Sequence, residues 1–252
     1  MIFPTLSRPG TSPTLVCLPY FGGSARSFEA LWPLLPAAWS LRAYTLQSLG
    51  VENGAYSVET GVTQLAQAIA RDVSGPFHLL GHSMGGKFAL GLAASNIEGL
   101  QSVVLLAPSP PSPEPMSDAA RAGMLARHGT REGALETLRR ASFAPLSNEL
   151  VEHFVEDDLA TGENDWRNWL ERGSREDRSA WLSQVRVPVR ILVGEHDGGM
   201  TPQLMNSAIL EPLRALHGAG VATALEVVTG SGHLLPLEAP DEVARHLTGW
   251  LS

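Results

Sequence analysis

The sequence predicts an α/β fold with a mostly parallel sheet that is covered by helices on both faces. Short, continuously apolar segments alternate with helical segments along most of the chain, as in sheets whose strands are buried on both sides. Hydrophobic residues make up 44% and charged residues 17% of the 252 residues, which is ordinary for a folded protein with a core. A chain of this length holds one large α/β domain or two small ones.

The first 110 residues show the alternation clearly. Residues 1–13 contain three prolines and leave room for at most one short edge strand. Buried strands are expected in four apolar segments: Thr14–Pro19, Leu41–Leu46, Phe77–Leu80 and Ser102–Ala107. Helices are expected between them, near Ser27–Leu35, from the N-cap Ser57 through Ala70, and at Phe88–Ala94.

The pattern changes after the fourth strand. Five prolines fall between Pro108 and Pro115, and no strand is evident from Met116 to Leu182. We interpret residues 111–182 as a helical cap, inserted into a core formed by residues 1–110 and 183–252. Helical segments within the cap are expected at Ser117–Arg127, Arg131–Arg140, Asn148–Leu159 and Asp165–Arg172.

The alternation resumes after the cap. Strands are expected at Val189–Gly194 and Leu225–Thr229, and helices at Pro202–His217 and Pro240–Leu251. These segments complete the core.

Composition excludes several classes of function. The net charge of −8 disfavours nucleic-acid and anionic-membrane partners. No apolar run has the length of a membrane span, and Met1–Pro4 lacks the features of a signal peptide, so a cytoplasmic location is expected. The single cysteine, Cys17, lies in an apolar strand and is expected to be buried. No zinc-ligand spacing, Walker loop or dinucleotide fingerprint is present, so we expect no metal and no cofactor.

Gly81-His82-Ser83-Met84-Gly85 follows an apolar strand and precedes a helix, and it matches the G-x-S-x-G pattern. In a nucleophile elbow the serine occupies a strained turn that exposes its hydroxyl at the edge of the sheet. Glycine is needed on both sides because a side chain there would collide with neighbouring elements. The pattern alone also fits a glycine-rich turn without chemistry, but the strand before it and the helix after it favour a nucleophile at Ser83.

A serine nucleophile needs a base and an acid that orients the base. Asp197 and His233 each follow a predicted strand, and the carboxyl ends of parallel strands open at the same edge of the sheet as Ser83. The chain order Ser, Asp, His is typical of this architecture. His196 competes for the role of base and Glu195 for that of acid, but base and acid are expected from separate loops.

The backbone N–H groups of Met84 and Phe21 are expected to form the oxyanion hole. Met84 directly follows the nucleophile, and Phe21 lies in the loop after the first buried strand, where Gly22 and Gly23 permit close approach of the backbone. Three of the six tryptophans fall in the cap, where packing explains them more readily than substrate contact does. The candidate pocket residues are Tyr20, Trp166, Trp169, Trp181 and Leu234.

These features resemble those of the α/β-hydrolase fold superfamily over nearly the whole chain. The elbow Gly81–Lys87 and the run Ser231–Pro240 are similar to the cofactor-free serine esterase branch. The run Leu18–Ala25 is instead similar to type II thioesterases, which release acyl groups from carrier proteins.

Three further details depart from the esterase pattern. Pro19-Tyr20 stands where the branch has His-Gly, and Gln47–Gly50 replaces its Pro-Gly-His-Gly. The acid turn Asp197–Pro202 has one residue more than the common spacing. The N-terminal segment is also too short for the full leading strand pair, which is another thioesterase-like trait.

The resemblance implies a serine hydrolase that cleaves a small-molecule carboxylic ester through an acyl-enzyme, with Ser83 as nucleophile, His233 as base and Asp197 as acid. A competing hypothesis is a thioesterase that acts on acyl carrier protein or acyl-CoA, with the carrier protein as partner. Two less favoured hypotheses are carbon–carbon bond hydrolysis or lyase chemistry, and a receptor that binds a small ligand without turnover.

Overall fold

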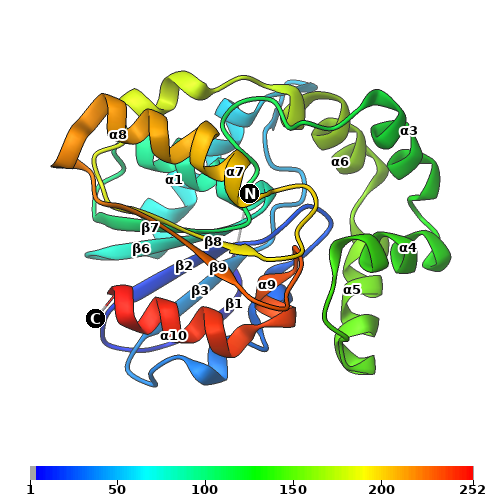
Figure 1. Cartoon of the computed structure of the whole chain (residues 1–252), viewed down its shortest axis with the longest axis horizontal. Helices are drawn as coiled ribbons and strands as arrows, with labels where there is room; N and C mark the ends of the chain where they lie inside the picture. The colour runs from blue at the N-terminus through cyan, green and yellow to red at the C-terminus, as the bar shows by residue number, and fades with distance from the viewer. Residues whose placement is uncertain (1–3, 252) are drawn as a thin grey trace.

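Seven strands form one sheet in the computed structural model, which describes residues 4–251. In spatial order they are β1 (Pro4–Arg8), β3 (Ser40–Tyr44), β2 (Thr14–Leu18), β6 (Phe77–His82), β7 (Leu100–Leu106), β8 (Val189–Gly194) and β9 (Thr223–Val228) (Figure 1). Only β1 runs antiparallel to its neighbour, so the predicted mostly parallel sheet is confirmed. The single edge strand expected near the N-terminus is β1, and residues 1–3 lie outside the described part.

Helices follow most of the strands and fill the segment between β7 and β8. The α-helices are α1 (Val58–Asp72), α2 (Met84–Ala94), α3 (Asp118–Arg127), α4 (Arg131–Ala141), α5 (Asn148–Ala160), α6 (Glu163–Arg167), α7 (Pro202–Met205), α8 (Glu211–His217), α9 (Leu235–Glu238) and α10 (Pro240–Leu251). The 3-10 helices are η1 (Ala25–Phe28), η2 (Trp32–Leu34), η4 (Gly173–Arg175), η5 (Ser179–Ser183) and η7 (Gly218–Gly220), and the π-helical turns are η3 (Asn168–Arg172) and η6 (Asn206–Leu210).

The strand ends are in line at the edge that carries the functional loops. Leu18 of β2 is opposite Gly81 of β6, and His82 is opposite Leu106 of β7. Gly194 of β8 is likewise opposite Val228 of β9. Because these strands are parallel, the loops that follow them emerge at one edge of the sheet.

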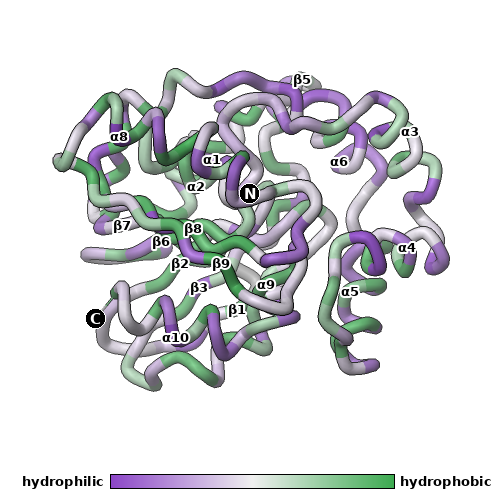
Figure 2. Tube along the Cα trace, viewed as in Figure 1, coloured by the Kyte–Doolittle hydropathy of each residue, from purple (hydrophilic) through white to green (hydrophobic). Residues whose placement is uncertain are grey.

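Both faces of the sheet are buried, because neighbouring residues of a strand point to opposite sides. Leu79 belongs to the hydrophobic core under α1, α2 and α8, and Leu80 belongs to the core under α10 and the 3-10 helices η1 and η2. Figure 1 shows α1 and α8 on one side of the sheet and α10 on the other. Hydrophobic residues are concentrated along the central strands (Figure 2).

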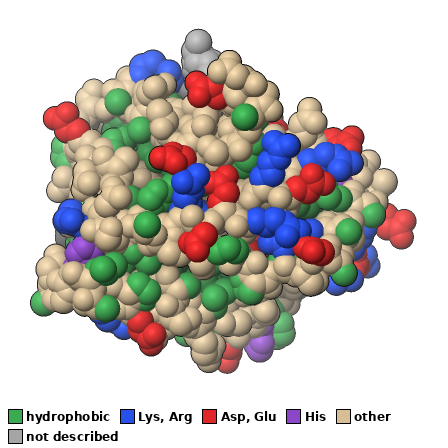
Figure 3. Space-filling view, turned by 90° about the horizontal axis from the view of Figure 1, so that it is seen from above, with side chains coloured by type: hydrophobic (Ala, Val, Ile, Leu, Met, Phe, Trp, Pro, Cys, Tyr) green, Lys and Arg blue, Asp and Glu red, His purple; other side chains and the backbone are tan. Residues whose placement is uncertain are grey.

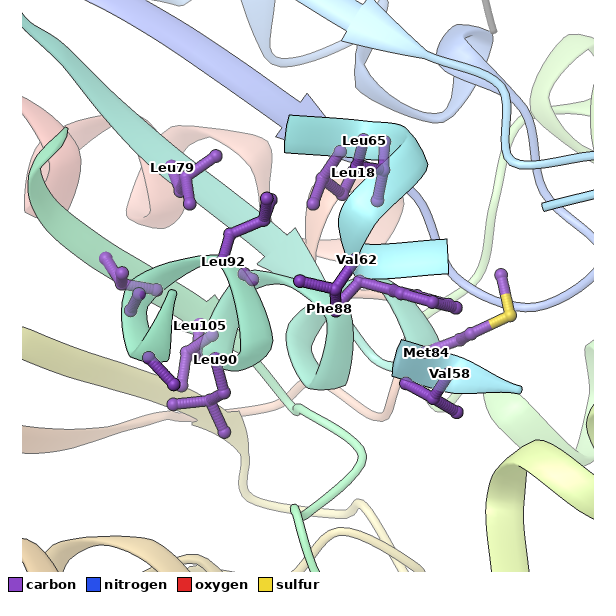
Figure 4. Close-up of a cluster of buried hydrophobic side chains, with 14 of the residues drawn as sticks. Leu18, Val58, Val62, Leu65, Leu79, Met84, Phe88, Leu90, Leu92 and Leu105 are labelled. Carbon is purple, nitrogen blue, oxygen red and sulfur yellow. The ribbon is translucent and has the colours of Figure 1, made fainter. Parts of the chain in front are cut away.

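Figure 4 shows how α1 and α2 pack on the sheet. Residues of both helices interdigitate with strand residues in a closely packed cluster. The labelled members of the cluster are Leu18, Val58, Val62, Leu65, Leu79, Met84, Phe88, Leu90, Leu92 and Leu105. This packing holds α2 firmly against the strand that precedes it.

The helices of the inserted segment, α3 to α6, lie together at one end of the molecule (Figure 1). They follow β7 and precede β8, so the expected helical insertion is confirmed. Basic and acidic side chains are intermingled on the face seen in Figure 3. Many of the charged side chains are paired, as Arg167 is with Glu163 and Glu171. Over residues 4–251, every helix is too short or too polar to span a bilayer.

Two predicted helices differ from the structure at prolines. The helix expected near Ser27–Leu35 is present as η1 and η2, with Pro33 at the start of the second. The helix expected at Pro202–His217 contains the π-helical turn η6 just before Pro212. A proline has no N–H for the regular helical hydrogen bond, so the backbone breaks or widens there.

A small hairpin was not predicted from the sequence. Strands β4 (Val51–Glu52) and β5 (Ala55–Tyr56) pair around Asn53 and Gly54, which both have positive φ. Asn-Gly is the preferred dipeptide for this two-residue turn, so the sequence did carry a signal for it.

Candidate active site

Ser83 occupies the sharp turn between β6 and α2. Its φ of 52° is rare for a residue with a side chain, and its own side chain accepts no capping hydrogen bond from α2. A Cβ on Gly81 would lie 2.6 Å from the carbonyl oxygen of Gly85, and one on Gly85 would collide with the carbonyl of Leu18. Both glycines are therefore required by close packing of the backbone.

A chain of hydrogen bonds joins Ser83, His233 and Asp197. The distance between Nε2 of His233 and Oγ of Ser83 is 2.9 Å, and Nδ1 of His233 lies 2.6 Å from Oδ2 of Asp197. The other oxygen of Asp197 accepts hydrogen bonds from the amides of Gly199 and Met200, each at 2.9 Å. The loop after β8 thus holds the carboxylate in place, and the longer acid turn does not displace it from His233.

The electrostatics of the chain favour an ionised acid beside a basic imidazole. Burial opposes ionisation of Asp197, but the hydrogen bond and charge of His233, together with the amide donors, lower its pKa to about 2. Burial also opposes protonation of His233, but the hydrogen bond and charge of Asp197 outweigh it and raise the pKa of the imidazole. Asp197 therefore carries its charge throughout the neutral pH range.

The remaining histidines of this region do not reach Ser83. His196 stacks on Phe143, with ring centroids 3.6 Å apart, and Glu195 accepts a hydrogen bond from the amide of Gly230. His82 is fully buried, and its Nε2 donates to the backbone oxygen of His233 at 2.8 Å. Burial lowers the pKa of His82 to about 3, so this ring is neutral at physiological pH.

The amides expected to form an oxyanion hole, those of Phe21 and Met84, have no hydrogen-bond acceptor among residues 4–251. Met84 is the first residue of α2, whose leading N–H groups lack partners within the helix. The amide of Gly85 instead bonds to the carbonyl of Pro19, which fixes α2 against the loop after β2.

A cavity of about 360 Å³ opens at Ser83. Most of its wall is apolar, with charged and polar side chains at Glu114 and on α3 and α4. The lining side chains include Tyr20, Phe21, Glu114, Met116, Met124, Arg127, Thr137, Arg140, Phe143, Phe154, Trp169, Leu170, His196 and Leu234. We call it the Ser83 cavity.

Three of the five predicted pocket residues, Tyr20, Trp169 and Leu234, line the Ser83 cavity. Trp166 and Trp181 do not. Trp166 is only 1% exposed and packs between Phe21 and His128, with ring centroids 4.6 and 4.5 Å away, so it supports the loop after β2. Trp181 lies against α2 and under the guanidinium of Arg178.

Several residues of the cavity were not identified from the sequence. Glu114 lies in the proline-rich segment and Met116 directly after it, and Met124, Arg127 and Leu170 come from the cap helices. Their side-chain directions depend on how these helices pack on one another, which periodicity does not reveal. Among residues 4–251, no three His, Cys, Asp or Glu side chains gather as a metal site would require.

Comparison with known families decides where the chain belongs. A model described as the alpha/beta hydrolase family matches residues 15–246. The chain is an α/β hydrolase. The match runs from β2 into α10, so it includes Ser83, Asp197 and His233.

Relatives of this α/β hydrolase include esterases. It is 32% identical over 106 residues to a pimeloyl-[acyl-carrier protein] methyl ester esterase from Aeromonas hydrophila, a match that covers 42% of each chain. It is 25% identical over 198 residues to the protein of the same name from Neisseria meningitidis serogroup C, which covers 73% of this chain and 75% of that protein.

Solved structures show the same fold. An esterase from Exiguobacterium antarcticum superposes with a TM-score of 0.78 at 17% identity, covering 99% of this chain and 95% of that one. The predicted fold class is therefore confirmed, and the family model that matches residues 15–246 confirms the predicted superfamily.

Proposed function

We propose that this α/β hydrolase cleaves a carboxylic ester, with Ser83 as nucleophile, His233 as general base and Asp197 as the acid that orients it. The observation that carries the proposal is the hydrogen-bonded chain from Asp197 through His233 to Ser83, at the end of a largely apolar cavity. The esterase names of its relatives support the same class of reaction.

The reaction proceeds in two halves. Oγ of Ser83 attacks the acyl carbon while Nε2 of His233 takes its proton, and the amides of Phe21 and Met84 stabilise the oxyanion. The protonated imidazole then gives this proton to the departing alcohol, which leaves an acyl-enzyme. In the second half His233 takes a proton from water, the resulting hydroxide attacks the acyl carbon, and Ser83 recovers its proton as the acid leaves.

Asp197 supplies orientation and charge rather than a proton. Its carboxylate accepts the Nδ1–H of His233, so the lone pair of Nε2 faces Ser83. Its negative charge stabilises the imidazolium formed in each half-reaction. The oxyanion donors add a second contribution, since losing one such donor costs about 10²- to 10³-fold in rate.

The test compares the unsubstituted protein with Ser83→Ala on p-nitrophenyl esters of two to twelve carbons. We expect turnover that Ser83→Ala abolishes, together with covalent labelling of Ser83 by a fluorophosphonate. Leu216→Ala, which removes an exposed side chain on α8 outside the cavity, serves as a folded control that keeps the triad. Labelling without turnover of any ester would favour lyase chemistry or a ligand receptor, and absence of labelling would exclude a serine nucleophile.

We propose acyl groups carried by an acyl carrier protein as the second candidate substrate class. The Aeromonas and Neisseria relatives are pimeloyl-[acyl-carrier protein] methyl ester esterases, and Arg127 and Arg140 are among the residues that line the Ser83 cavity. Cationic side chains there suit the phosphate of a carrier's prosthetic group. The test uses the same acyl group as a methyl ester and as an N-acetylcysteamine thioester, each in free and in carrier-bound form. Comparing the methyl ester with the thioester separates ester from thioester chemistry. Comparing the free form with the carrier-bound form shows whether the carrier protein is recognised.

A further inference from the structure

Glu238 binds four backbone amides from two separate segments. Oε2 accepts hydrogen bonds from the amides of Gly232 (2.9 Å), Phe143 (2.7 Å) and Ala144 (2.8 Å). Oε1 accepts one from the amide of Leu234 at 2.8 Å. Glu238 is the last residue of the short helix α9, so its own position is set by the main chain that follows His233.

The first segment is the loop that carries His233. The amides bonded to Glu238 belong to Gly232 and Leu234, the residues on either side of His233. The backbone of His233 is itself bonded on both sides, because its amide donates to the carbonyl of Ala141 at 2.8 Å and its oxygen accepts from His82. The loop has no regular secondary structure, so these bonds determine where the imidazole lies.

The second segment belongs to the cap. Ala141, Phe143 and Ala144 lie at the end of α4 and in the connection after it, and the ring of Phe143 stacks on His196, next to Asp197 in the chain. One short stretch of the cap therefore contacts the loops of both the base and the acid. Glu238 is the side chain that joins this stretch to the base loop.

We propose that Glu238 is a positioning residue that holds His233 in line with Ser83 and couples the cap segment 141–144 to the triad. The proposal rests on the catalytic roles proposed above for Ser83 and His233. An ionised carboxylate suits this place because both of its oxygens only accept hydrogen bonds, and four N–H groups converge on it. A glutamine keeps one acceptor oxygen but turns an NH₂ group toward N–H donors.

The charge of Glu238 also acts on the imidazole. The ionisable groups that interact with His233 include Asp197, Glu114, Glu238 and His82. Asp197, Glu114 and Glu238 raise its pKa, whereas the buried ring of His82 would oppose a charge beside it. Neutralising Glu238 is expected to lower the pKa of His233 as well as loosen its loop.

The experiment compares Glu238→Gln and Glu238→Ala with Glu242→Gln, which removes an exposed carboxylate on α10 that pairs with Arg245. Five quantities are measured: the thermal unfolding midpoint, the rate of Ser83 labelling by a fluorophosphonate, kcat and KM for a p-nitrophenyl ester, and the pKa of His233 by NMR. For Glu238→Gln we expect labelling and kcat to fall about 10- to 100-fold with KM nearly unchanged, because small displacements of a reacting group have effects of this size. The pKa of His233 should fall, and Glu242→Gln should stay within about twofold of the unsubstituted protein.

Unchanged labelling rate and unchanged His233 pKa in folded Glu238→Gln would overturn the proposal. A loss of activity that matches the unfolded fraction, with normal labelling of the folded fraction, would also overturn it. If Glu238→Ala does not fold, Glu238→Gln alone decides. Failure of the proposed function is recognised separately, because it shows as absent ester turnover in the unsubstituted protein, whereas labelling and the His233 pKa still report on the role of Glu238.

Discussion

At the scale of single residues, the proposed mechanism makes activity depend on the protonation state of His233. The imidazole must be neutral to take a proton from Ser83, and its pKa lies above the ordinary value for histidine because of the carboxylates around it. Asp197, with a pKa of about 2, stays ionised across the pH range in which His233 titrates. The acid side of the pH–rate profile therefore reports on His233.

A substitution at Glu114 is expected to shift the acid limb of the pH–rate profile. Its carboxyl is only 7% exposed, lines the Ser83 cavity, and is one of the groups that raise the pKa of His233. Burial raises the pKa of Glu114 itself, while the nearby positive charges of Lys87, Arg121 and His233 oppose this effect.

We predict that Glu114→Gln shifts the acid limb of kcat/KM to lower pH. The substitution removes a negative charge near the imidazole, so His233 loses its proton at a lower pH and is neutral over a wider range. The measurement is the pH dependence of kcat/KM for an uncharged ester, with exposed Glu98→Gln as control. An unmoved limb, or one moved to higher pH, would show that Glu114 does not act on His233.

The site residues that could be located from the sequence are those that directly follow a predicted strand. The convergence of Ser83, Asp197 and His233 at one edge of the sheet could be predicted, because a motif and three apolar strands place them there. Glu114 and Glu238 could not, because one lies in a proline-rich segment and the other sits in a four-residue helix. The direction of such side chains is set by tertiary contacts alone.

At the scale of elements, the strands and most helices agree with the sequence because each is marked by continuous apolar runs or by a capping residue. Ser57, for example, caps α1 as predicted and accepts a hydrogen bond from the amide of Thr60. The failures occur where a proline interrupts a helical period, at Pro33 and Pro212, and where two residues suffice for a turn. These are local backbone effects that outweigh apolar periodicity.

The connection between α2 and the cap depends on one buried cation. Lys87 is fully buried on α2, and Nζ donates to the backbone oxygens of Ser112 (3.3 Å), Gly173 (3.2 Å) and Glu176 (2.7 Å). Ser112 lies where the chain enters the cap, and the other two lie near where it leaves. Lys87 therefore joins both ends of the cap to α2, the helix that follows Ser83.

We predict that Lys87→Met loosens the cap. Methionine replaces the apolar stem but leaves three carbonyls without their donor, which should lower the free energy of unfolding by about 1–3 kcal/mol. Hydrogen exchange should increase at both ends of the cap before it increases in the sheet. The matched control is Arg172→Met on the cap surface, and equal exchange in the two variants would contradict the role given to Lys87.

At the scale of the whole molecule, the sheet carries the proposed catalytic residues and the cap supplies most of the wall of the Ser83 cavity. Ser83, Asp197 and His233 lie on loops after β6, β8 and β9, whereas most of the opposite wall comes from cap residues. The general fold could be predicted because it depends on strand order and periodicity. The cavity could not, since its width depends on the packing of α3, α4, α5 and η3 against one another.

Because the cap forms most of the cavity wall, we predict that cap substitutions change the selectivity for the acyl chain without abolishing ester hydrolysis. Met124 lies on α3, lines the Ser83 cavity and makes no hydrogen bond to the triad. Met124→Trp should fill part of the cavity and lower kcat/KM for acyl chains of eight to twelve carbons about tenfold more than for two to four carbons, as one methylene in an apolar pocket can alter kcat/KM by about 10-fold or more. The labelling rate of Ser83 by a small fluorophosphonate should change little.

Leu159→Trp is the matched control, because Leu159 lies on α5 with 41% of its surface exposed and does not line the cavity. The series of p-nitrophenyl esters measures the outcome for both variants. An equal loss for short and long chains, with normal labelling of Ser83, would mean that the acyl chain does not extend toward α3. The alcohol portion of the substrate would then occupy that side, and the cap would select the leaving group instead.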